Sequence, residues 1–161
     1  MIVRILLAAL IGTALLGAAW PVVDEARHDA AASEVEREAN ALSYAIEDIA
    51  SSSDPVPRHV PGGRRDVEVT LPRGGEDAAI VVGSGQESSA MDGGGSDVVS
   101  YRTGGSRAGQ IRVDAEIRVD RGDGVDTDGD GLVLRDTTRL FLRYEFVADR
   151  PTVIVSRSDR P

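Results

Sequence analysis

The sequence contains no cysteine, no lysine and only two histidines, and these shortages exclude several classes of site. Without cysteine the chain has no disulfide framework and no thiolate for a metal or redox centre. The histidines, His28 and His59, do not define a zinc site by themselves. We therefore expect the 161 residues to form one globular domain behind a leader segment, stabilised by burial and hydrogen bonding.

The charged residues are unbalanced in number and in kind. Acidic residues number 27 against 18 basic ones, every basic residue is arginine, and the net charge is −9. This composition suits a protein that works at high salt, where surface repulsion is screened, and we interpret the chain as haloarchaeal. A GC-rich genome is the alternative, although it explains the acidic excess less well. Phosphate contacts to nucleic acid are not expected from such a surface.

An uncharged apolar run covers residues 5–23. About 19 residues at about 1.5 Å each match the hydrocarbon thickness of a bilayer. Arg4 precedes the run, and Asp24 and Glu25 follow it, which places the N-terminus in the cytoplasm and the main domain outside. We predict that residues 1–23 form a transmembrane helix, which makes the chain a single-pass protein of the cell membrane.

A cleaved signal peptide is the alternative for this run. Gly17 and Ala19 would supply the small residues of a cleavage site, and the released chain would begin at Trp20. The run continues apolar past that point, and the following residues favour more helix. The retained anchor is therefore the preferred interpretation.

Residues 24–53 predict an amphipathic helix that continues the apolar one. This segment is rich in Ala and Glu, and Pro55 ends it, while Pro21 is expected to kink the junction. One apolar stripe recurs at helical spacing, formed by Val35, Ala39, Leu42, Ile46 and Ile49. The stripe predicts packing on the protein's own sheet, with a coiled-coil seam as the alternative.

A linker over 54–65 is expected to lead into a sheet domain over 66–161. Alternating apolar residues predict strands over 66–71, 78–82, 98–102, 110–120, 132–135, 140–147 and 152–156. In the fourth of these, the apolar residues alternate with side chains expected on a solvated face, namely Arg112, Asp114, Glu116 and Arg118. The predicted fold class is α+β, with the long helix, membrane part and amphipathic part together, packed on an antiparallel sheet.

One acidic segment carries the sharpest local motif. Asp126, Asp128 and Asp130 alternate ahead of Gly131, as in the first half of an EF-hand calcium loop. The twelfth position is Thr137 instead of glutamate, and the flanks are strands instead of helices. The three aspartates are therefore a candidate weak calcium site, and an ordinary acidic turn is the alternative.

Catalytic machinery is not evident in the sequence. Gly104-Gly105-Ser106-Arg107-Ala108 comes nearest to a nucleophile elbow, but no helix follows it. The glycine clusters at 83–85 and 93–95 lack the Gly-Lys-Ser/Thr of a phosphate-binding loop. We predict a protein that is not an enzyme, with no catalytic residue and no cofactor other than calcium.

An apolar helix that continues through a proline into an amphipathic helix and then a sheet resembles type IV pilins and pseudopilins. The chain is also similar to short haloarchaeal proteins that share the Arg4-preceded leader, the acidic-Ala-Arg continuation and the Leu-Val-Leu-Arg strand at Leu132 to Arg135. The resemblance implies a structural subunit of a type IV pilus or secretion-like system, whose partners are the membrane and other pilin-like subunits. The apolar run lacks a glutamate near its start, which favours an accessory subunit over a major one. The runner-up is an exported domain that binds calcium or another small ligand after signal cleavage.

Overall fold

One long helix precedes a single sheet in the computed structural model of the chain. The structure describes residues 2–58, 60, 62–72, 78–83, 96–103, 108–122, 124–125 and 131–157. Within the helix, side chains are described at Leu10, at Thr13 and from Glu25 onward.

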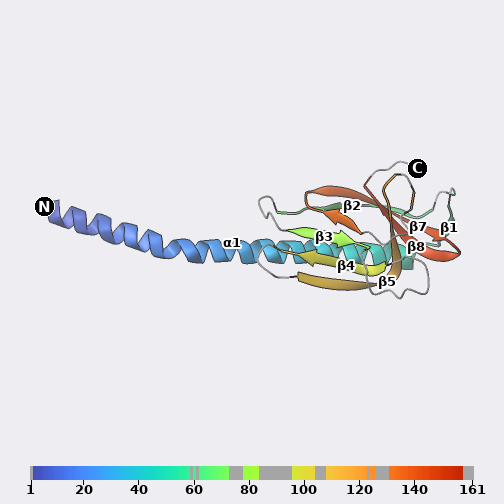
Figure 1. Cartoon of the computed structure of the whole chain (residues 1–161), viewed down its shortest axis with the longest axis horizontal. Helices are drawn as coiled ribbons and strands as arrows, with labels where there is room; N and C mark the ends of the chain where they lie inside the picture. Colours follow the sequence, from blue (N-terminus) through green and yellow to red (C-terminus); the bar gives the residue numbers. More distant parts are fainter. Residues whose placement is uncertain are drawn as a thin grey trace.

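The helix α1 (Ile2–Ser52) is continuous through Pro21. Its N-terminal half extends away from the sheet with a gentle curve, and its C-terminal half lies alongside the strands (Figure 1). The side chains of residues 25–30 are all exposed, and regular burial begins only at Ala32. A single helix therefore has one half that projects from the sheet and one half that lies in the core.

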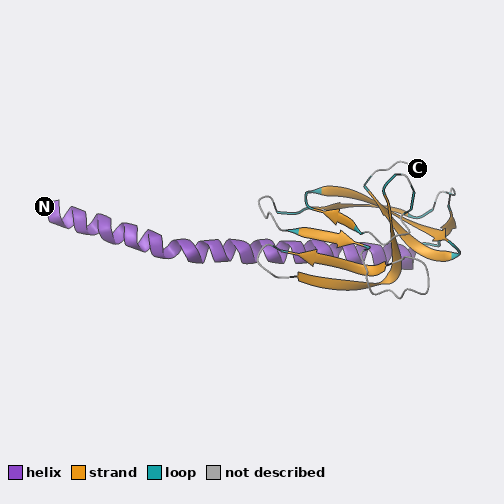
Figure 2. Cartoon of the chain, in the orientation of Figure 1, coloured by secondary structure: helices purple, strands orange, loops and turns teal. Residues whose placement is uncertain are grey.

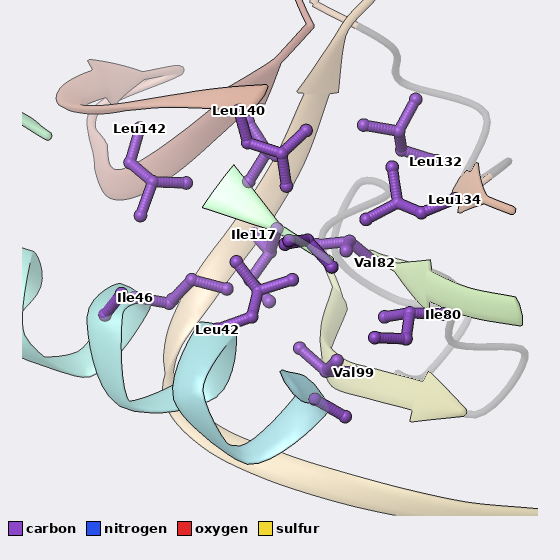
Figure 3. Packing of buried hydrophobic residues seen from close by; sticks show 14 of the residues in the cluster. Leu42, Ile46, Ile80, Val82, Val99, Ile117, Leu132, Leu134, Leu140 and Leu142 are labelled. Carbon is purple, nitrogen blue, oxygen red and sulfur yellow. The ribbon is translucent and has the colours of Figure 1, made fainter. Parts of the chain in front are cut away.

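The predicted apolar stripe of α1 is confirmed as the part of the helix that enters the core. All five of its residues are buried and belong to one hydrophobic cluster with the strands. Leu42 and Ile46 are fully buried and lie close to side chains from several strands, including Ile117, Leu140 and Leu142 (Figure 3). The stripe packs on the protein's own sheet, which is the preferred of the two interpretations of its spacing.

The described strands form one mixed sheet (Figure 2). The order across it is β1-β7-β8-β5-β4-β3-β6, and β2 pairs with β7 beside β1. The strand bounds are β1 (Val56–Pro57), β2 (Arg64–Val69), β3 (Ala79–Val82), β4 (Ser96–Arg102), β5 (Ala108–Asp120), β6 (Leu132–Leu134), β7 (Thr138–Val147) and β8 (Arg150–Ser156). Six of these strands contact α1, because the sheet curls around one side of the helix like half of a barrel.

The predicted fold class is wrong in two respects. The sheet is not antiparallel, because β1 runs parallel to β7 and β8 runs parallel to β5. The fold is also β-dominated, with a curled half-barrel in place of a helix laid across a sheet. The physical reason lies in the hairpin of β7 and β8: β8 pairs antiparallel with β7 on one side and fills the space beside β5 on the other. Because β7 runs opposite to β5, its antiparallel neighbour β8 runs in the same direction as β5.

The predicted fold class also included a membrane part of the helix. Within the described part of the chain, no helix has the length and apolar character that crossing a membrane requires.

Two local boundaries differ from the sequence-based expectation. The linker expected over 54–65 contains β1 and the first residues of β2. The last strand, expected over 152–156, begins instead at Arg150, and the turn before it is the pair Ala148 and Asp149, both with positive φ. Two positive φ values give the tight turn that suits the twist of a hairpin. Pro151 belongs to β8 and pairs with Phe146 of β7. The pairing of β8 with β5 begins one residue later, at Thr152, so the N–H that proline lacks is not needed for a bond to β5.

Candidate functional site

A cleft of about 490 Å³ lies where β5 and β8 end. The two strands are parallel, so their C-terminal ends meet at the same edge of the sheet, beside the start of β6. The residues that line the cleft come from the end of β5, the start of β6 and the end of β8: Asp120, Arg121, Gly122, Gly131, Leu132, Val133, Ser156 and Arg157. The cleft is therefore a product of the strand order, because no continuous segment of the chain could form it.

Asp120 is fixed by two hydrogen bonds at the end of β5. The Gly122 N–H donates to its Oδ1 at 2.9 Å, and Arg143 Nη2 donates to its Oδ2 at 2.9 Å. Gly122 has φ +99°, a conformation that favours glycine, and this allows the chain to turn back toward the carboxylate. Both carboxylate oxygens are thus engaged in holding the strand end and its turn.

Two arginines tie the cleft's walls together through backbone carbonyls. Arg121 Nη2 donates to the Gly131 carbonyl at 3.4 Å, and Arg157 Nη2 donates to the Val133 carbonyl. Both arginine residues are exposed at the mouth of the cleft. The bonds connect the ends of β5 and β8 to the segment that enters β6.

A second charged group lies along the outer face of β5, β7 and β8, away from α1. Arg143 also approaches Glu145, with 3.4 Å between Nη1 and Oε1, and Arg118 Nη2 lies 2.9 Å from Glu116 Oε1. The pairing register places Arg143 and Arg118 on opposite sides of Ile154, which is fully buried. We name these side chains, together with Asp120, the charged cluster.

Burial of the charged cluster corrects one sequence-based expectation. The charged face of β5 was expected to be solvated, but Arg118 is only 6% exposed. The Glu145 side chain is 7% exposed, and its Oε2 has no hydrogen-bond partner among the described residues. A buried carboxylate oxygen without a partner is costly, so the charged cluster is held by the surrounding strands more than by ideal pairing.

The predicted calcium ligands Asp126, Asp128 and Asp130 lie outside the described residues, and calcium binding stays a prediction. The segment that contains them joins the two parts of the cleft's wall, from Gly122 on one side to Gly131 on the other. Among the residues that the structure describes, no three or more His, Asp or Glu side chains are grouped so that they could hold a metal ion.

The other residues considered from the sequence take no part in the cleft. His28 lies on the exposed part of α1 and does not line the cleft, and His59 is outside the described residues. Thr137, at the twelfth position of the calcium motif, is exposed and does not line the cleft. The residue that sequence reasoning missed is Arg157, since only the parallel pairing of β5 and β8 brings it beside Asp120.

Chemically, the cleft combines a fixed, ion-paired carboxylate with two guanidinium groups and a short apolar wall. Such a set can recognise and orient an anionic group.

The fold and the cleft together define a class: a long helix, half projecting, joined to a curled mixed sheet with a charged cleft at one edge. The chain matches the family described as a domain of unknown function (DUF7311) over residues 2–158, and it belongs to that family. No curated protein and no solved structure matches it.

Proposed function

We propose that this protein is a structural subunit of a type IV pilus-like or secretion-like assembly at the cell surface, and that it is not an enzyme. In this proposal, the N-terminal half of α1 packs in an apolar environment made by neighbouring subunits and lipid. The sheet lies outside the cell and contacts other components. The chain would be an accessory subunit, in line with its resemblance to pilins and pseudopilins.

The observation that supports the proposal is the division of α1. The C-terminal half buries its stripe in the sheet, whereas the N-terminal half projects from it as continuous helix (Figure 1). Residues 5–23 of that half carry no charge. An isolated apolar helix is poorly stable in water, because helices in proteins depend on the burial of their apolar side chains. Partner helices and lipid would provide that burial.

A cysteine placed on each half of α1 tests the proposal directly. The chain has no native cysteine, so single substitutions give an unambiguous crosslink. Leu10 is 66% exposed on the projecting half, and Tyr44 is 68% exposed beside the sheet, which makes them matched positions. With an oxidant in intact cells, Leu10→Cys is expected to give covalent adducts with neighbouring subunits, and Tyr44→Cys is not. Adducts from both variants, or from neither, would contradict packing through the N-terminal half.

Removal of residues 2–23 is the second test. The truncated chain is expected to leave the membrane fraction and to keep the circular dichroism of the sheet, because the buried stripe begins later in the helix. Continued sedimentation with membranes would show that another part of the chain carries the attachment. N-terminal sequencing of the native protein provides the remaining control: a start at Met1 or Ile2 supports the proposal, whereas a start at Trp20 would mean that the packing helix is removed.

A further inference from the structure

We propose that the cleft at the ends of β5 and β8 binds a carboxylate group, which the guanidinium of Arg157 holds while Leu132 and Val133 contact the carbon chain beside it. The proposal does not depend on the structural role described above. It depends on the lining of the cleft, on the partners of its charged groups and on its size.

Among the described residues that line the cleft, the charge that remains available is the positive charge of Arg157. Asp120 is the acidic residue among the described lining residues, and its two oxygens already accept hydrogen bonds from Gly122 and Arg143. Arg157 donates to a neutral carbonyl, that of Val133. A guanidinium has five N–H donors, and among the described residues this carbonyl accounts for one of them. The Arg157 guanidinium is therefore positioned by a neutral group and keeps its charge for a ligand.

A carboxylate fits this arrangement better than a phosphate. One planar guanidinium matches the two oxygens of a carboxylate in a bidentate pair. Phosphate sites, in contrast, commonly use several backbone N–H groups at a helix N-terminus. The described helix begins far from the cleft, at the other end of the molecule (Figure 1).

The size and the apolar wall indicate that the carboxylate belongs to a larger group. A volume of about 490 Å³ lies within the usual range for small-molecule sites and exceeds what a single acetate fills. Val133 is 39% exposed, and Leu132 is nearly buried beside it, so a short apolar surface lies next to the arginine. A dicarboxylate or a glutamate side chain of a peptide would present both a carboxylate and a methylene chain to these groups.

Calorimetric titration of the full-length chain in a non-ionic detergent tests the proposal, with low chloride to limit competition. The probes are glutarate, the peptide acetyl-Gly-Glu-Gly-amide, its glutamine counterpart and inorganic phosphate. Glutarate or the glutamate peptide is expected to bind, and the glutamine peptide is not. The tighter of the two carboxylate probes identifies the source as a free dicarboxylate or a protein side chain.

Two arginine variants distinguish the cleft from general surface attraction. Arg157→Gln is expected to weaken carboxylate binding on the order of tenfold or more, since a charge-assisted pair is lost. Arg112→Gln removes the same charge from a side chain that is 75% exposed and lies far along β5, and it is expected to bind normally. Arg157→Lys keeps the charge but loses the two parallel N–H donors of the planar guanidinium, and an intermediate affinity is expected. Circular dichroism confirms that each variant is folded.

Three results would overturn the proposal. The first is no heat of binding for either carboxylate probe with the unmodified chain. The second is equal loss of binding in the Arg157→Gln and Arg112→Gln variants, which would assign the effect to surface charge. The third is phosphate binding more tightly than glutarate, which would assign the cleft to another anion.

Discussion

The strands β5, β7 and β8 bury side chains on both of their faces, but the two faces differ in chemistry. The face toward α1 consists of apolar side chains such as Ile117, Leu142 and Val153, all at most 1% exposed. The opposite face holds the charged cluster, in which Arg118 and Glu145 are buried nearly as well. Apolar burial stabilises through area and tolerates small shifts, whereas buried charges depend on the position of each partner. The comparison indicates that one face supplies stability and the other makes the strand register specific.

Shortening a side chain on the apolar face should have the largest effect. Leu42→Ala is expected to lower the free energy of unfolding by about 3–4 kcal/mol, because it leaves a cavity beneath the sheet. Leu42 is fully buried, whereas Tyr44 on the same helix is 68% exposed, so Tyr44→Ala serves as the control. Urea unfolding of the full-length chain measures both, and equal effects would mean that the stripe is not the main contact.

Removing the central cation of the charged cluster should come next. Arg143→Gln leaves Asp120 and Glu145 without their shared partner, and we expect a loss of about 2–3 kcal/mol, reduced from the fully buried case because Arg143 is 16% exposed. Added salt should change this loss little, because partly buried pairs are weakly screened. A loss below about 0.5 kcal/mol would show that water already solvates the charged cluster.

Glu145→Gln should have a smaller effect, of opposite sign. The substitution keeps the shape of the side chain and the pair between Arg143 and Asp120, while it removes a buried charge with an unpartnered oxygen. We expect a gain of up to about 1 kcal/mol in the free energy of unfolding. A clear loss would instead mean that the Glu145 charge is needed by Arg143. The same urea titration gives the answer, with Arg143→Gln measured in parallel.

The smallest effect is expected at an exposed ion pair between α1 and β2. Asp48 accepts a hydrogen bond from Arg65, and both side chains are about 40% exposed. Asp48→Asn should therefore cost about 0.5 kcal/mol or less, and the difference should vanish at high salt. A larger loss that does not depend on salt would mean that this pair contributes to stability in the same way as the buried pairs of the charged cluster.

The apolar face could be predicted from the sequence, and the charged face could not. The stripe on α1 and the alternation in β5 are local patterns, and both identify the side chains that enter the core. Alternation also shows that Glu116 and Arg118 share a face, but it carries no information about which strands lie beside them. Their burial depends on β8 entering between β7 and β5, a pairing of segments that are distant in the sequence.

The candidate site shows the same difference between local patterns, which the sequence reveals, and contacts between distant segments, which it does not. The acidic motif at Asp126, Asp128 and Asp130 was found because its residues are close in sequence. The described cleft is lined by Asp120, Val133 and Arg157, which come from distant segments and meet only through the sheet, and Arg143 of β7 holds Asp120 in place. Their spacing in the chain gives no signal, and the arginine after β8 is one of 18 arginines in the sequence, with nothing local to distinguish it.

The continuity of α1 has a mechanical consequence. The helix axis and the strands beside it run in roughly the same direction, and six strands contact the helix (Figure 1). A pull on the projecting end would therefore load these contacts in shear, all at once, instead of peeling them apart in sequence. Resistance to such a pull is set by the barrier to unfolding and not by the equilibrium stability. The molecule is built to withstand tension applied along its own helix.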